Sequence, residues 1–118
     1  MNNFTYYTPT KVVFGRGSEG QTGALVRERG CKKVLLHYGG GSAVRSGLLD
    51  RVKARLTGEV SVFDRVEPDP SLRLVAEGVR AVRTFRPEAV VAFGGGSPMD
   101  CAKGMCWFSG RHPPLWCI

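Results

Sequence analysis

Two glycine-rich turns are the segments of this sequence best suited to chemistry. Gly94, Gly95, Gly96 and Ser97 follow an apolar run at residues 90–93. A second apolar run, at residues 33–38, leads in the same way into Gly39, Gly40, Gly41 and Ser42. A turn that binds pyrophosphate through backbone N–H groups must let its backbone approach the anion, which side chains would prevent. Each turn is therefore a candidate phosphate site.

A helix is expected directly after the turn at residues 94–97, and it would strengthen such a site. The N-terminus of a helix carries a partial positive charge and unpaired N–H groups, and both favour an anion. We expect Pro98 at the first helical position, where no donor is needed. Ser97 would offer a hydroxyl to a phosphate oxygen, and Asp100 would cap the turn or reach a ribose or nicotinamide group.

Spacing alone does not decide what the two turns do. Neither matches the GxGxxG fingerprint of dinucleotide sites or the P-loop of nucleotide sites. Glycine turns also let helices pack tightly on a sheet. The spacing of a single turn is therefore equally compatible with a structural role and with a phosphate site. The repetition favours the phosphate site, because each turn follows a strand and precedes a helix. Ligands of open α/β sheets bind at the carboxyl ends of the strands.

Hydrophobic periodicity predicts the elements that position these turns. Strands are expected at residues 33–38, 60–63 and 90–93, and two short strands with a bend between them at residues 4–14. Helical spacing predicts helices at residues 18–30, 44–56, 71–85 and about 98–108, with Ser18 and Ser71 as N-caps. No regular element is expected in residues 111–118. Strands that alternate with amphipathic helices predict the α/β class, a Rossmann-like parallel sheet with flanking helices.

The composition is that of one small globular domain. The chain has 118 residues, of which 42% are hydrophobic and 23% charged, enough for one core and one site. No apolar run reaches the roughly 20 residues of a membrane span, and the N-terminus lacks the layout of a secretion signal. We therefore expect a cytoplasmic protein without a membrane partner. The four cysteines form no CxxC pair and the two histidines lie far apart, which argues against a zinc site and a disulfide framework.

The net charge of +7 raises the question of a polyanionic partner. Most of the arginines fall between the apolar positions of helical segments, so we interpret them as the solvated faces of helices. Basic and aromatic residues do not alternate as a base-stacking surface requires. We therefore expect no nucleic-acid partner.

Four motifs occur in the order found in one protein family. They are FTYYTPTKVVFG at residues 4–15, VLLHYGGGS at 34–42, EPDP at 67–70 and AFGGGSPMDCAK at 92–103. In these motifs the sequence resembles the iron-containing alcohol dehydrogenases, in particular the butanol dehydrogenase-like, NADPH-dependent aldehyde reductase branch. The resemblance implies an N-terminal α/β domain that binds a dinucleotide. It also implies an all-helical C-terminal domain that holds iron or another divalent metal through an Asp and three His.

The resemblance also assigns a role to each turn. It implies contacts to the cofactor pyrophosphate from Gly94, Gly95, Gly96 and Ser97, with Asp100 close to the nicotinamide. The adenosine ribose would lie by Gly39, Gly40, Gly41 and Ser42. Enzymes that prefer NAD commonly place an acidic residue there. This sequence has none, and Arg45 follows, so we expect NADP(H), with NAD as the second choice. No residue of the chain is assigned a catalytic or metal-binding role.

The family pattern ends near Arg111. We interpret residues 1–110 as an incomplete dinucleotide-binding domain and residues 111–118 as a divergent tail, the result of a truncation or a frameshift. The metal domain would be missing. The family reaction is hydride transfer between NADP(H) and a primary alcohol or aldehyde, and this chain alone would be inactive. The alternatives are a stand-alone nucleotide-binding fragment without catalysis and a marginal fragment that aggregates. A homodimer is compatible with either function.

Overall fold

A four-stranded parallel sheet forms the centre of the computed structural model, which describes residues 3–118. The strand order is β2-β1-β3-β4. The strands are β1 (Lys33–Tyr38), β2 (Glu59–Phe63), β3 (Ala89–Phe93) and β4 (Leu115–Cys117). Every residue of β3 is buried, and so are the four central residues of β1. This burial explains why neither strand alternates between apolar and polar residues, because strands covered on both faces need no alternation.

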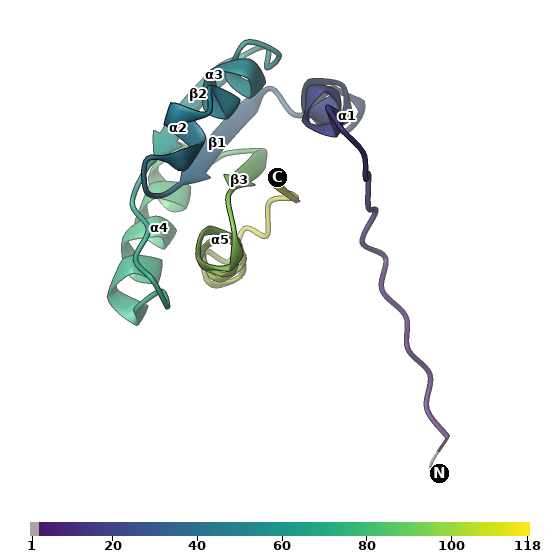
Figure 1. Cartoon of the computed structure of the whole chain (residues 1–118). Helices are drawn as coiled ribbons and strands as arrows, with labels where there is room; N and C mark the ends of the chain where they lie inside the picture. Colours follow the sequence, from purple (N-terminus) through teal and green to yellow (C-terminus); the bar gives the residue numbers. More distant parts are fainter. Residues whose placement is uncertain (1–2) are drawn as a thin grey trace.

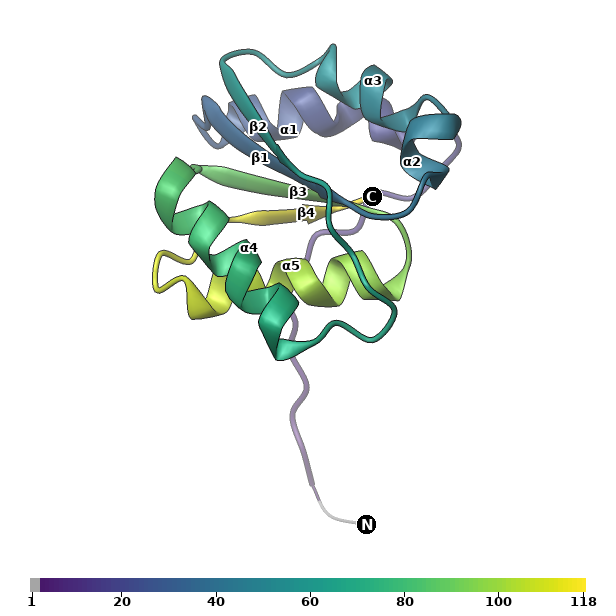
Figure 2. The ribbon, with the colours of Figure 1, turned by 90° about the vertical axis from the view of Figure 1, so that its left-hand side faces the viewer.

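Helices cover both faces of this sheet. One face carries α1 (Thr22–Glu28), α2 (Ser42–Arg45) and α3 (Leu48–Lys53), and the other carries α4 (Leu72–Phe85) and α5 (Gly96–Phe108), as Figures 1 and 2 show. A short 3-10 helix, η1 (Ser18–Gln21), precedes α1. The side chains of β3 alternate between two cores: Val91 and Phe93 face α1 to α3, and Val90 and Ala92 face α4 and α5. The predicted α/β class and Rossmann-like sheet are confirmed.

The residues before η1 do not form the two predicted strands. Residues 3–14 have no strand assignment, and the segment extends away from the body of the molecule (Figure 1). Val13 is half-buried, but the other large apolar side chains of the segment are between 79% and 99% exposed, namely Phe4, Tyr6, Tyr7, Val12 and Phe14. A strand needs the hydrogen bonds of a neighbouring strand, which a favourable composition cannot replace. The prediction of strands in this segment is therefore wrong.

Three helix boundaries also differ from the predicted ones. The helix expected over residues 44–56 is divided into α2 and α3, because Gly47 between them adopts a left-handed conformation with φ of 71°. Ser18 makes no capping hydrogen bond, and α1 begins only after the 3-10 turn of η1. Helix α5 begins at Gly96, so Pro98 occupies the third helical position rather than the first. It still lies in the first turn, where a missing N–H costs no helical hydrogen bond.

The predicted start of helix α4 is confirmed, whereas strand β4 was not predicted. Ser71 caps α4 as predicted, with its Oγ accepting a hydrogen bond of 3.2 Å from the N–H of Leu74. Strand β4 lies in the segment for which no regular element was expected. It pairs in parallel with β3, and the N–H of Ile118 donates to the carbonyl of Ala92 at 2.8 Å. Three residues are too few to show a periodicity, so only the pairing reveals this strand.

Candidate functional site

The two glycine turns leave the sheet side by side. β1 and β3 are neighbours, with Tyr38 opposite Phe93, and the turns begin at the next residue of each strand. The turn after β1 leads to α2 on one face, and the turn after β3 leads to α5 on the opposite face. Adjacent loops that diverge in this way form a topological switch point, which is where open α/β sheets bind ligands. We call this edge of the molecule the glycine crevice.

The second turn along the chain, from Gly94 to Ser97, offers backbone donors to a ligand. Within residues 3–118, the N–H groups of Gly95, Gly96 and Ser97 have no hydrogen-bond acceptor. They lie at the N-terminus of α5, a helix of 13 residues whose partial positive charge favours an anion. Gly94 differs, because its N–H donates to the carbonyl of Ile118 at 2.9 Å. The amides available to an anion are therefore those of residues 95–97.

The space around each glycine of this turn shows why it is a glycine. A Cβ added to Gly95 or Gly96 would meet no atom within 4 Å, so packing within the described residues does not require glycine at either position. Gly94 has φ of 123°, and a Cβ there would lie 2.8 Å from Cγ of Pro98. Gly94 therefore serves the conformation of the turn. An open backbone at Gly95 and Gly96 is what close approach of a ligand requires.

Neighbouring side chains limit the space around the first turn, from Gly39 to Ser42, more than around the second. A Cβ on Gly39 would collide with the side chain of Val66, which lies in the loop between β2 and α4. A Cβ on Gly41 would collide with the guanidinium of Arg45, which folds back over the turn. Only Gly40, with φ of 59°, has open space around its Cα. Helix α2 has four residues, too few to add a useful partial charge.

The polar side chains predicted for the site lie at the surface of the same edge. Ser42 is exposed at the start of α2, and Ser97 is half-buried in the first turn of α5. Asp100 is exposed, and its carboxylate lies 3.9 Å from Nζ of Lys103. Within residues 3–118 the Asp100 side chain makes no hydrogen bond to the turn, so the expected capping role is not present. The carboxylate remains accessible to a ligand.

His37 is a buried polar residue beside the crevice whose environment the sequence did not reveal. Its ring is 0% exposed and stacks on Phe63 with centroids 5.2 Å apart. Nδ1 lies 2.9 Å from the carbonyl oxygen of Phe63, and Nε2 has no partner within residues 3–118. Because a carbonyl only accepts, Nδ1 must donate and Nε2 is an unpaired acceptor. Burial lowers the pKa of His37, although the bond to Phe63 acts in the other direction. The ring is therefore neutral.

No metal site accompanies the crevice in the described part of the chain. Residues 3–118 contain no cluster of three or more His, Cys, Asp or Glu side chains that would hold a metal ion. The four cysteines are free, and burial raises the pKa of Cys101 to about 11 and that of Cys106 to about 12. Both buried thiols are therefore protonated and unreactive near neutral pH.

Within residues 3–118, no helix is long and apolar enough to cross a membrane.

Two hollows of the surface lie away from the glycine turns. One, of about 390 Å³, follows the outer faces of α4 and α5. The other, of about 950 Å³, lies between residues 9–13, α1 and β4. Neither is lined by a residue of the two turns.

Comparison with known proteins gives consistent matches. The family described as iron-containing alcohol dehydrogenase matches residues 9–117. The probable NADH-dependent butanol dehydrogenase 2 of Bacillus subtilis is 44% identical over 108 residues, which cover 89% of this chain and 27% of that protein. The NADPH-dependent butanol dehydrogenase of Clostridium saccharobutylicum is 42% identical over 116 residues, which cover 96% of this chain and 28% of that protein.

A solved structure agrees with these sequence matches. The NADH-dependent butanol dehydrogenase A of Thermotoga maritima superposes with a TM-score of 0.84 at 38% identity, covering 90% of this chain and 27% of that structure. The chain thus spans only 27–28% of the length of these three relatives.

Proposed function

Because the chain belongs to the iron-containing alcohol dehydrogenase family, we propose that it provides the dinucleotide-binding part of an alcohol dehydrogenase or aldehyde reductase. The family resemblance of the sequence motifs is confirmed by the match over residues 9–117. The proposed reaction is hydride transfer between NADP(H) and a primary alcohol or aldehyde. The observation that most supports the proposal is the set of unpaired N–H groups of Gly95, Gly96 and Ser97 at the switch point.

Each part of the crevice has its own task when the cofactor is bound. The amides of residues 95–97 and the Ser97 hydroxyl hold the pyrophosphate at the N-terminus of α5. Gly94 keeps the turn in its conformation. The first turn, from Gly39 to Ser42, would hold the adenosine ribose. Asp100, one helical turn after Gly96, would serve the nicotinamide side. The nicotinamide supplies the hydride chemistry, and the protein orients it.

Residues 3–118 do not fit the metal for which the family is named. They offer no cluster of three ligands, so we assign no reaction step to a metal in this chain. We propose that residues 1–118 on their own bind the dinucleotide without turnover.

Substitution of Gly95 tests the binding proposal directly. Because a Cβ at Gly95 meets nothing within 4 Å, Gly95→Ala should keep the fold but place a methyl group where the pyrophosphate approaches. We expect the affinity for NADPH, measured by the change in its fluorescence, to fall by about tenfold or more, equivalent to about 1.4 kcal/mol.

Gly20→Ala is the matched control for this substitution. A Cβ at Gly20, in η1, makes only ordinary contacts of 3.7 Å or longer with Arg55. We expect this variant to bind NADPH like the unchanged chain. Equal affinities of the Gly95→Ala and Gly20→Ala variants, both folded by circular dichroism, would overturn the proposed pyrophosphate site.

We propose NADP(H) rather than NAD(H) as the preferred cofactor. Residues 39–42 place no carboxylate beside the expected ribose, and the guanidinium of Arg45 lies over Gly41. An arginine binds a phosphate with charge-assisted hydrogen bonds, which suits the 2′-phosphate of NADP. The relatives described above include NADH-dependent and NADPH-dependent enzymes, so Arg45 carries this proposal.

Removal of the Arg45 side chain separates the two cofactors. We expect Arg45→Ala to weaken NADPH binding by about tenfold and NADH binding by less than about twofold. Titration of both cofactors against this variant and against Lys53→Ala, an exposed residue of α3, measures the difference. An equal loss for NADPH and NADH would remove the basis for the NADP preference.

We place the protein in the cytoplasm and propose a homodimer on more general grounds. The four cysteines are free, which suits a reducing compartment. The exposed apolar side chains of residues 4–14 offer a surface that a second copy would cover.

A further inference from the structure

A groove on the outer surface of α4 and α5 lies apart from the glycine crevice. It has a volume of about 390 Å³. Leu72, Val75 and Val79 of α4 line it together with Phe108, the last residue of α5. The crevice lies at the opposite end of α5, at its first turn. The groove is therefore a separate surface, whose occupant need not compete with the dinucleotide.

The apolar part of this groove is open to solvent. Leu72 is 86% exposed and Phe108 is 62% exposed, and the neighbouring Trp107 is 67% exposed. Leu72, Val75 and Val79 of α4, which line the groove, follow at intervals of three and four, so they form one stripe along the helix. Scattered exposed apolar residues need no explanation, but a continuous set that lines one groove indicates an interaction surface.

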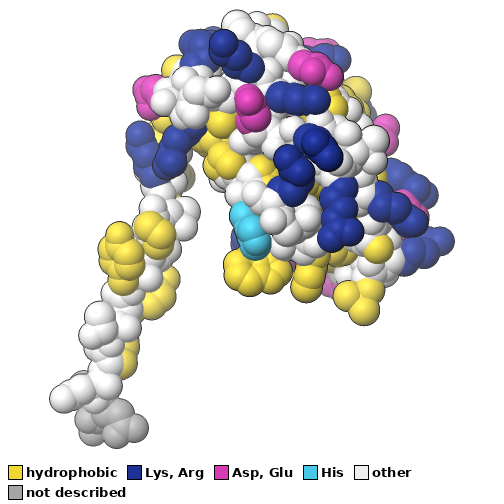
Figure 3. All heavy atoms as spheres, turned by 180° about the vertical axis from the view of Figure 1, so that it is seen from behind, with side chains coloured by type: hydrophobic (Ala, Val, Ile, Leu, Met, Phe, Trp, Pro, Cys, Tyr) yellow, Lys and Arg dark blue, Asp and Glu magenta, His cyan; other side chains and the backbone are white. Residues whose placement is uncertain are grey.

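Arg80 and Arg83 give the same groove a positive charge. Both line it, no Asp or Glu does, and within residues 3–118 neither arginine forms an ion pair. Arg83 is held in place, because its Nε donates to the carbonyl of Ser109 at 3.2 Å and its Nη2 to that of Phe108 at 3.3 Å. Five N–H donors on a guanidinium leave others for a partner. Figure 3 shows Lys and Arg side chains gathered on one face, with hydrophobic side chains along its lower margin.

We propose that this groove binds an acidic amphipathic helix of a partner protein. Two helices packed side by side leave a groove that accepts a third helix. Helix α4 has 14 residues, so it offers a contact about 21 Å long at about 1.5 Å per residue. The apolar side of the partner helix packs on Leu72, Val79 and Phe108, and its carboxylates pair with Arg80 and Arg83. A second copy of this chain is a poor occupant, because it carries a net charge of +7 and the same arginines.

A designed peptide tests this proposal on the full 118-residue chain. The probe is a synthetic peptide of 14 residues, the length of α4, with leucines at intervals of three and four and glutamates beside them. The control peptide has the same composition in scrambled order. In amide NMR spectra we expect the ordered peptide to shift signals of residues 72–83 and 107–109 and to leave those of residues 94–97 unchanged.

Charge reversal on the protein identifies the contact. Arg80→Glu should weaken binding of the acidic peptide by about fivefold or more. It should also strengthen binding of a second peptide in which lysines replace the glutamates. Lys53→Glu, an exposed position of α3 on the other face of the sheet, should change either affinity by less than about twofold. Arg83 is left unchanged because it holds the end of α5.

Several outcomes would overturn the proposal. Equal weakening by Arg80→Glu and Lys53→Glu would show a general effect of charge rather than a site. Equal binding of the ordered and scrambled peptides would show that no helix is recognised. Shifts confined to residues 94–97, or no binding of the acidic peptide at low ionic strength, would contradict it as well.

Discussion

His37 makes the stability of the folded chain depend on pH in the mildly acidic range. The buried neutral ring has a pKa lowered from its ordinary value of 6.5, mainly by loss of solvation. In the unfolded chain the same ring takes up its proton near pH 6.5. Between the two pKa values the unfolded state therefore binds more protons than the folded state. The contribution of His37 to stability is complete above about pH 6.5 and is lost as the pH falls below that value.

Urea denaturation at several pH values measures this contribution. We expect the free energy of unfolding to decrease from about pH 6.5 to about pH 5.5, and to decrease less in a His37→Phe variant. Phenylalanine keeps an aromatic ring at this position but carries no titrating proton, so the slope rather than the absolute stability is the readout. Replacement of the exposed His112 by Gln is the control for loss of a histidine at the surface. The same slope in the unchanged chain and the His37→Phe variant would contradict the assignment.

At the scale of the elements, the turn after β1 packs closely against the loop between β2 and α4. A methyl group at Gly39 would collide with the side chain of Val66. We expect Gly39→Ala to lower the free energy of unfolding by about 1–3 kcal/mol, the usual cost of overpacking. The additional change Val66→Gly should restore part of this loss, because the two positions are in contact.

Gly20→Ala and Gly95→Ala are the references for this effect, since neither added methyl group meets a close neighbour. Thermal and urea unfolding of the three single variants gives the comparison. If Gly39→Ala is no less stable than the two references, the close packing of Gly39 on Val66 is wrong. The same result would leave Gly39 free to serve a ligand instead.

The sequence predicted those elements whose signals are local. The strands containing residues 33–38, 60–63 and 90–93 are each within one residue of β1, β2 and β3, because apolar runs end at glycine or charged residues. Ser71 marked the start of α4 for a local reason as well. The segment at residues 4–14 failed because a strand depends on a partner. Strand β4 was missed because it depends on pairing with β3, and the division of the chain at residue 110 stays a prediction.

The site was predictable in position but not in the separate roles of its glycines. Two turns after two strands were enough to expect a shared edge, and the pairing of Tyr38 with Phe93 brings the turns together. The separate roles depend on residues distant in sequence. Val66 explains Gly39, and Ile118 takes the N–H of Gly94. No pattern along the chain encodes these contacts.

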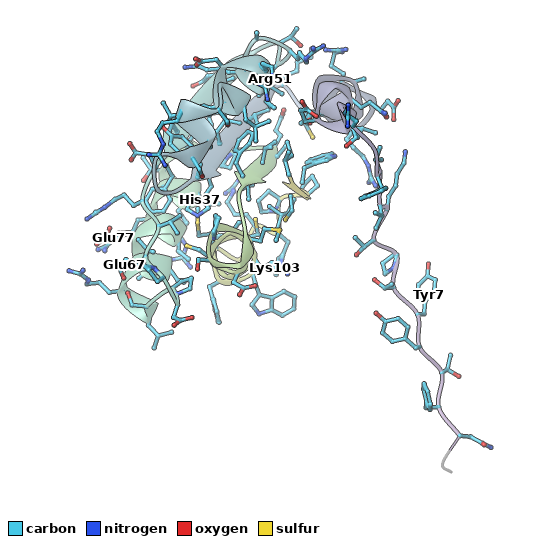
Figure 4. All side chains as sticks on the ribbon, viewed as in Figure 1. Tyr7, His37, Arg51, Glu67, Glu77 and Lys103 are labelled. Carbon is cyan, nitrogen blue, oxygen red and sulfur yellow. The ribbon has the colours of Figure 1, made fainter. Side chains whose placement is uncertain are left out.

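At the scale of the whole molecule, helices cover both faces of the sheet, while the N-terminal segment exposes its apolar side chains. Figure 4 shows His37 in the interior near the end of β1, and Tyr7 far from the body on the extended N-terminal segment. Within residues 3–118, β4 pairs with β3 alone, so the backbone donors and acceptors of its other edge have no strand partner. Exposed edges and apolar segments favour association with other chains.

Amide NMR during a titration with NADPH tests the central claim most directly. If the N-terminus of α5 holds the pyrophosphate, the largest shifts will occur at the amides of Gly95, Gly96 and Ser97, with further shifts in the first turn. Inorganic pyrophosphate should shift the signals of residues 95–97 and leave those of the first turn unchanged. Binding of NADPH that leaves the amides of residues 95–97 unshifted would contradict the account.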